Sequence, residues 1–234
     1  MPDLRAVLLD AGGTLIHPDR DFILARLAEE GITATLEAYH DARRLARDAV
    51  GDILRSTDPG TDATRARTYF AALLTALGLP PHRLAAFGGR IRQRHEEGRL
   101  WVHMEPDTLE ALDALKRAGL RLAVISNADG RVAEYLENAG LDGRFEFVLD
   151  STVVGIEKPD PRIFTMACER LGVAPGETVY VGDTYEVDVL GARAAGIRAV
   201  LLVDQPRDDV ACIGSIAELP AALGLARAAP GAVP

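Results

Sequence analysis

The sequence predicts an α/β protein with a doubly wound parallel sheet, a Rossmann-like core into which a helical domain is inserted. From residue 104 onwards, short apolar runs typical of buried strands alternate with segments of helical periodicity. Strands separated by helices of this length pair in parallel through right-handed crossovers. Between residues 17 and 103, in contrast, the apolar positions have helical spacing almost throughout. These observations define the fold class.

Charge supports the same division. The chain has 234 residues, 48% of them apolar, which is enough for a sizeable core. Residues 17–103 contain 13 arginines and 12 acidic residues, whereas the rest of the chain contains 13 basic and 23 acidic residues. We therefore expect a core built from residues 1–16 and 104–221 and a separate helical module at 17–103. Residues 222–234, rich in Ala, Gly and Pro, are expected to be a frayed tail.

The elements can be assigned in order along the chain. Residues 5–9 form a short buried strand that ends at Asp10, before a Gly12-Gly13 turn. Residues 21–100 are helical, with a stop at 78–80. After Pro106 we expect helices and strands in turn: a helix up to residue 119, a strand at 120–125, a helix at 131–138, a strand at 145–149, a helix at 161–171, a strand at 178–181, a helix at 187–195 and a strand at 198–203.

Residues suited to phosphate or metal follow several of these strands. They are Asp10, Ser126 with Asn127, Lys158, and Asp183 with Asp188. Ligands of open α/β sheets bind outside the carboxyl ends of the strands, so these stretches can converge on one site. Each residue alone is also typical of a structural role, because a strand-end Asp or Ser often caps a turn and a single Lys is usually solvated. Their order along the chain is more specific than any one of them.

In this order the motifs resemble those of the haloacid dehalogenase superfamily. Its members carry a strand-end Asp followed by x-x-Gly-Thr, a Ser or Thr after a later strand, a Lys before a later helix, and a Gly-Asp-x-x-x-x-Asp motif. This chain offers Asp10 to Thr14, Ser126, Lys158 and Gly182-Asp183 to Asp188. The resemblance covers nearly the whole chain. It implies a hydrolase whose residues 17–103 form the helical cap that follows the first motif.

The resemblance also implies the chemistry. Asp10 would attack phosphorus and form an aspartyl phosphate, with Ser126 and Lys158 as the other catalytic residues. The implied phosphate contacts are Gly13, Thr14, Ser126, Asn127 and Lys158, with backbone N–H groups as the donors near Asn127. The implied cofactor is Mg²⁺, a hard ion that favours oxygen ligands, held by Asp10, the Gly12 carbonyl and Asp183. Asp188 would act at the metal through water or as a hydrogen-bond acceptor next to these ligands. We therefore expect a Mg²⁺-dependent phosphatase that acts on a small phosphorylated metabolite.

Gly12 departs from the family pattern. Phosphatases of this superfamily usually carry a second Asp two residues after the nucleophile, which protonates the leaving oxygen and later activates water. A glycine keeps the backbone carbonyl but cannot transfer a proton, a function that typically contributes roughly 10²- to 10⁴-fold in rate. Either the substrate has a good leaving group, as in acyl, aryl or anhydride phosphates, or another acid such as His17 takes this part. Efficient hydrolysis of alkyl phosphates is not expected.

Other functions can be weighed against the sequence. A non-catalytic descendant that uses the site for binding stays open. Haloacid dehalogenases lack the acid that Asp183 supplies here, so the sequence disfavours that activity. Phosphonatases use a cap lysine as a Schiff base, and residues 17–103 contain none. In the cap, Arg43, Arg44 and Arg47 are candidates for contact with an anionic substrate, although the last two also fit a solvated helix face.

Composition limits the partners. The net charge of −9 disfavours nucleic acid, whose phosphates are bound by clustered Lys and Arg. No apolar run approaches the roughly 20 residues that span a bilayer. We expect a cytoplasmic monomer or homodimer with a small-molecule substrate and with neither a nucleic acid nor a membrane as partner.

Overall fold

The computed structural model describes residues 4–58, 60–203 and 205–225. They form two units, one of which is His17–His103 and the other the described residues before and after that insert. The expected frayed tail, residues 222–234, lies mostly outside the described residues. As far as Leu225 the backbone is hydrogen-bonded, because the Leu225 N–H donates to Pro220 O at 2.9 Å.

The core unit is built on a six-stranded sheet in the order β5-β4-β1-β6-β7-β8, and every pairing in it is parallel. The strands are β1 (Ala6–Leu9), β4 (Arg121–Ser126), β5 (Val148–Asp150), β6 (Thr178–Gly182), β7 (Arg198–Leu202) and β8 (Ala211–Ile213). Their sequences are nearly continuous apolar runs because both faces of a parallel sheet are covered. The predicted doubly wound α/β fold is confirmed.

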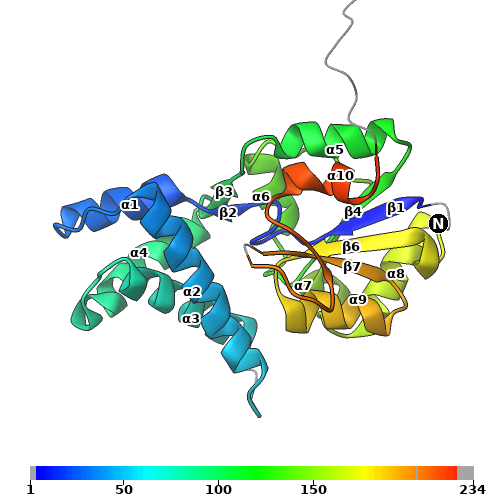
Figure 1. Cartoon of the computed structure of the whole chain (residues 1–234). Coiled ribbons are helices and arrows are strands. Elements are labelled where there is room, and N and C mark those ends of the chain that lie inside the picture. Colours follow the sequence, from blue (N-terminus) through cyan, green and yellow to red (C-terminus); the bar gives the residue numbers. More distant parts are fainter. Residues whose placement is uncertain (1–3, 59, 204, 226–234) are drawn as a thin grey trace, which may run out of the picture. The chain divides into compact units, whose positions relative to one another are not determined.

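Helices cover both faces of this sheet. Figure 1 shows α5 and α10 on one face and α8 and α9 on the other. The helices of the core unit are α5 (Thr108–Arg117), α6 (Val132–Asn138), α7 (Ser151–Val154), α8 (Pro161–Leu171), α9 (Leu190–Ala194) and α10 (Leu219–Ala222). Single turns of 3₁₀-helix precede β6 and α10, at Pro175–Glu177 and Ile216–Glu218.

Side chains at alternate strand positions form one layer of the core. Leu8, Ile125 and Tyr180 come from β1, β4 and β6 and belong to the same buried cluster as Phe164 of α8. Alternation of this kind places these side chains on one face of the sheet. In the same register Leu9 lies beside Val124 and Val181, so the segments that follow the three strands leave the sheet at one edge.

Some elements of the core differ from the prediction. The strand expected at 145–149 is limited to Val148–Asp150, and the helix expected at 187–195 begins as a π-helical turn, Tyr185–Val189, before α9. The elements β8, α7 and α10 were not predicted. Each has only three or four residues, which is too short for a hydrophobic period to be recognised.

The helical unit contains α1 (Arg20–Glu29), α2 (Leu36–Leu54), α3 (Asp62–Ala76) and α4 (Leu84–Glu96), the last preceded by a 3₁₀ turn at Pro81–Arg83. Thr35 caps α2, since its hydroxyl accepts the Ala38 N–H at 3.1 Å. The two ends of the helical unit pair as short antiparallel strands, β2 (His17–Pro18) and β3 (Trp101–His103). These strands were not predicted. Among the described residues, no helix combines the length and apolarity needed to cross a membrane.

Candidate active site

Carboxylates from distant parts of the sequence meet at the carboxyl edge of the sheet. Asp10 follows β1, Ser126 closes β4 and Asp183 follows β6. The Asp10 N–H donates to Val181 O at 2.8 Å, which ties the end of β1 to β6. Oxygens of Asp10, Asp183 and Asp188 lie within 4.8 Å of one another. Such a group of oxygens can hold a metal ion.

Lys158 contacts two of these acids directly. Its Nζ donates to Asp10 Oδ1, to Asp188 Oδ1 and to the Tyr180 hydroxyl, each at 2.7 Å. The three bonds use all three donors of the ammonium group. The side chain is only 2% exposed. Lys158 is therefore not the solvated surface charge that a single lysine usually is.

The site contains more negative than positive charge, with three carboxylates around one ammonium. Burial raises the pKa of Asp10 to about 7, because the lowering by Lys158 is opposed by Asp188 and Asp183. Burial alone would lower the pKa of Lys158, but Asp10 and Asp188 outweigh it and hold that pKa above its usual range. Interactions among the carboxylates and the single cation contribute to both shifts. A divalent cation would supply the missing positive charge.

Asn127 fixes the backbone of Lys158. Its Nδ2 donates to Lys158 O at 2.9 Å, and its Oδ1 accepts the Lys158 N–H at 2.8 Å. The sequence predicts phosphate contacts from backbone N–H groups near Asn127, and the side-chain amide is bonded to the Lys158 backbone. A phosphate contact at this position would come from the Asn127 backbone.

The loop after β1 is held by its own backbone. The Ala11 carbonyl accepts the N–H groups of Leu15 and Ile16 at 2.9 and 3.0 Å, and the Gly13 N–H donates to Ile16 O at 2.8 Å. Gly13 has a φ of 88°, and a Cβ there would overlap Asp183 Oδ2. Glycine is required at this position because it allows both the positive φ and the close approach of Asp183.

The neighbours of Gly13 in this loop have different roles. Thr14 is buried, and its hydroxyl lies 3.5 Å from Asp10 Oδ2 as a donor. Both predicted phosphate donors, the Gly13 amide and the Thr14 hydroxyl, thus have partners inside the protein. Gly12 is not among the glycines with positive φ, so its backbone conformation does not require glycine.

Asp188 reaches the site on the π-helical turn Tyr185–Val189. Its Oδ2 accepts the Thr184 N–H at 2.9 Å, while its Oδ1 faces Lys158. A Cβ on Gly182 would overlap the Asp188 side chain, so glycine at the end of β6 allows the turn to pack against the strand. Both oxygens of Asp188 therefore have donors within the protein.

Tyr180 is a site residue that the sequence reasoning missed. Its side chain is fully buried in β6, and its hydroxyl lies 2.7 Å from Lys158 Nζ and 2.9 Å from Asp188 Oδ1. Burial raises the pKa of Tyr180 well above its usual range, so the phenol stays protonated. One signal could have found it: a tyrosine in a strand buried on both faces needs a partner for its hydroxyl.

A second buried polar cluster lies within the helical unit. Arg43 Nη2 donates to His17 Nδ1 at 2.6 Å, and both side chains are buried. A guanidinium only donates, so the neutral imidazole carries its hydrogen on Nε2. Burial, followed by Arg43 and His103, lowers the pKa of His17 well below its usual range. Arg44, in contrast, is paired with Asp41 at 3.1 Å on the surface.

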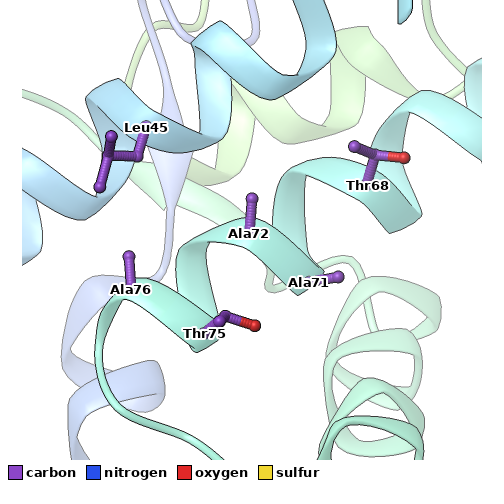
Figure 2. A pocket seen from close by; sticks show the side chains of 6 residues that line it. All are labelled: Leu45, Thr68, Ala71, Ala72, Thr75 and Ala76. Carbon is purple, nitrogen blue, oxygen red and sulfur yellow. The ribbon is translucent and has the colours of Figure 1, made fainter. Parts of the chain in front are cut away.

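An open groove of about 540 Å³ lies along α3 in the helical unit. Figure 2 shows its lining: Leu45, Thr68, Ala71, Ala72, Thr75 and Ala76. Methyl groups and two threonine hydroxyls line it, without an acid, a base or a strong nucleophile. The groove therefore offers no group suited to acid–base or nucleophilic chemistry.

Comparisons with known proteins agree with this geometry. The family model of haloacid dehalogenase-like hydrolases matches residues 4–196. Phosphoserine phosphatase of Thermus thermophilus is 35% identical over 211 residues, which cover 86% of this chain and 82% of that protein. Glyceraldehyde 3-phosphate phosphatase of Methanopyrus kandleri is 32% identical over 207 residues, covering 84% and 83%. A crystal structure of a dehalogenase with an intermediate complex has a TM-score of 0.65 and 27% identity, covering 97% of this chain and all of that chain.

Proposed function

This chain belongs to the haloacid dehalogenase-like hydrolase family, and we propose that it is a Mg²⁺-dependent phosphatase that hydrolyses a small phosphorylated metabolite through an aspartyl phosphate. The observation that carries this proposal is the cluster of Asp10, Asp183 and Asp188 beside the buried Lys158. The resemblance implies that haloacid dehalogenases lack the acid that Asp183 supplies here, which disfavours that activity. Two relatives that each match more than four fifths of the chain are named phosphatases, which supports the same choice.

The donor set fits Mg²⁺. We assign Asp10, Asp183 and the Gly12 carbonyl as its ligands, since a hard cation favours oxygen. Asp188 would act through water, because both of its oxygens accept hydrogen bonds from the protein. When bound, Mg²⁺ would offset the repulsion between the carboxylates and a phosphate dianion.

The residues of the chain divide the chemistry between them. In the proposed reaction the Asp10 carboxylate attacks phosphorus, the bond to the leaving oxygen breaks with its electron pair on that oxygen, and water then cleaves the acyl phosphate to restore Asp10. The Lys158 ammonium and the Ser126 hydroxyl would hold the transferring oxygens. Thr14 supports Asp10, and Asn127 supports Lys158, through the hydrogen bonds described above.

The leaving oxygen receives no proton from residue 12, which is glycine. His17 is a poor replacement, because its pKa is lowered and its Nδ1 already accepts from Arg43. A substrate that needs little protonation removes this difficulty. We therefore propose acyl, aryl or anhydride phosphates as the preferred chemical class. We further propose that the helical unit is the cap that selects among them.

Turnover of p-nitrophenyl phosphate, with Mg²⁺ and with excess EDTA, tests the proposal. We expect turnover that depends on Mg²⁺, slower turnover of an alkyl phosphate of similar size, and no halide release from 2-chloropropionate. Halide release without phosphate release would assign the dehalogenase activity instead. If neither phosphate nor halide is released while calorimetry still shows Mg²⁺ binding, the protein would be a binding protein and not an enzyme of either class.

A further inference from the structure

Tyr180, Lys158 and Asp188 form a closed triangle of hydrogen bonds. Lys158 Nζ donates to the Tyr180 hydroxyl and to Asp188 Oδ1, both at 2.7 Å, and the hydroxyl itself lies 2.9 Å from the same Oδ1. The hydroxyl has one hydrogen. The Ile125 carbonyl, at 3.4 Å, is a more distant and uncharged acceptor, so the hydrogen points to Asp188.

The position of this hydroxyl is set by a rigid part of the fold. Tyr180 pairs with Leu8 of β1 and with Ala199 of β7, so its backbone is held on both sides. Its ring meets the ring of Phe164 edge to face, with the centroids 4.9 Å apart. A group held on a central strand is positioned more accurately than one on a loop.

Lys158 has no N–H left for a phosphoryl oxygen while its three bonds persist. Two of its partners, Asp10 and Asp188, are carboxylates, and bonds between an ammonium and a carboxylate are the stronger kind. The Tyr180 oxygen is the one uncharged acceptor of the three. It is therefore the partner that a phosphoryl oxygen displaces most easily.

On this basis we propose that Tyr180 is a positioning residue, which holds the Lys158 ammonium in place. When substrate binds, the Lys158 N–H that was bonded to the Tyr180 hydroxyl is transferred to a phosphoryl oxygen as its new acceptor. The hydroxyl keeps its own bond to Asp188 during the exchange, so Asp188 remains oriented. This inference rests on the proposed phosphatase function. It adds to that function a residue outside the motifs that the resemblance identified.

Tyr180→Phe tests the proposal because it removes the hydroxyl and keeps the ring on Phe164. We expect kcat for p-nitrophenyl phosphate to fall about tenfold, since Lys158 is less well oriented. The inhibition constant of inorganic phosphate should not rise, because an N–H of Lys158 no longer has to leave the Tyr180 hydroxyl before it can bind phosphate. Tyr39→Phe is the matched control: Tyr39 is equally buried, and its hydroxyl has no hydrogen-bond partner among the described residues.

The chain offers a second readout that does not depend on activity. It contains only two lysines, Lys116 and Lys158. In a Lys116→Arg background, protein with ¹⁵N at the lysine side-chain nitrogen gives a single ammonium signal in NMR spectra. We expect Tyr180→Phe to move this signal and to speed its proton exchange about fivefold or more, and Tyr39→Phe to leave it in place.

Different outcomes would contradict the role of Tyr180 and the proposed phosphatase function. An unmoved Lys158 signal, an unchanged kcat, or equal losses of kcat and phosphate affinity with a lowered Tm would each overturn the role of Tyr180. A wild-type protein with a well-resolved, protected Lys158 signal but no turnover of phosphate esters would contradict the proposed function instead.

Discussion

The two buried polar clusters of this protein handle charge in opposite ways. In the core unit, Lys158 lies between carboxylates and its pKa is raised, so its ammonium group keeps its charge. In the helical unit, His17 accepts from Arg43 and its pKa is lowered, so the imidazole stays neutral. The buried tyrosines differ likewise, since the Tyr180 hydroxyl bonds to two charged groups whereas that of Tyr39 has no partner among the described residues. The core cluster has the charged groups that chemistry needs.

The clusters also respond to pH in opposite directions. The pKa of Asp10, about 7, lies above its unfolded value of about 3.9, so its contribution to stability is present below about pH 4 and is lost as the pH rises towards 7. The pKa of His17 lies below its unfolded value of about 6.5, so its contribution is present above that pH and is lost as the pH falls. Substitutions at these residues and at their neighbours therefore test the difference between the two clusters.

The largest effect is expected from Asp10→Asn. The amide is nearly isosteric but is a poor nucleophile, so turnover should fall by about three orders of magnitude or more. Without metal, the variant should be more stable than wild type at pH 8, by about 2 kcal/mol in the free energy of unfolding from urea, because a buried carboxylate is removed. Asp142→Asn, the same change at an exposed residue, is the control. Wild-type turnover in a folded Asp10→Asn protein would refute the nucleophile assignment.

The next largest effect is expected from Asp183→Ala. Loss of a principal carboxylate ligand should weaken Mg²⁺ binding about 100-fold, because substitutions even of supporting groups around metal ligands cost 10- to 100-fold. Titration of Mg²⁺ into both proteins by calorimetry gives the two dissociation constants. Equal constants would show that Asp183 is not a ligand and that the excess of carboxylates in the core has another purpose.

Gly12→Asp tests whether the core cluster lacks only a proton donor. We expect kcat for alkyl phosphates to rise about 10- to 100-fold, less than the roughly 10²- to 10⁴-fold of an evolved acid, and kcat for aryl phosphates to rise less. The Gly12 backbone has no positive φ that a side chain would strain. Gly89→Asp, at an exposed position of α4 where a Cβ has open space, controls for the added charge. If the folded, metal-bound variant gains nothing on alkyl phosphates, another group already supplies the proton.

The smallest effect is expected from His17→Gln in the helical unit. Between pH 7.5 and 5.5 the wild-type protein should lose about 1 kcal/mol of unfolding free energy relative to the variant, because the unfolded imidazole takes up a proton that the folded one refuses. Urea denaturation at the two pH values measures this difference. A pH dependence that is unchanged in the variant would show that burial and Arg43 do not hold His17 neutral.

The fold and the convergence of the candidate site residues could be predicted from the sequence because they depend on local patterns. The alternation of apolar runs and helices gives the parallel sheet, and strand ends such as Asp10, Ser126 and Asp183 are local features of it. The change of charge near residues 17 and 103 coincides with the bounds of the helical unit. Two-residue strands such as β2 leave no such pattern.

The hydrogen-bond network of the site could not be predicted, because it joins residues that are distant in the sequence. Lys158 bonds to Asp10 across 148 positions and to Asp188 across 30. The hydrogen bond from Lys158 to the Tyr180 hydroxyl depends on the register of β6 in the sheet. No local sequence pattern predicts that register. The side chain of Asn127 bonds to the Lys158 backbone, across 31 positions, for the same kind of reason.

The most direct test of the account is to find where the phosphoryl group resides during turnover. Wild-type protein is mixed with p-nitrophenyl phosphate and Mg²⁺, quenched in acid within the first turnover, digested and analysed by mass spectrometry. We predict one phosphoryl group on the peptide that contains Asp10, absent with EDTA and absent in Asp10→Asn. Phosphate release at the normal rate with a phosphoryl group on another residue, or on none, would contradict the central claim.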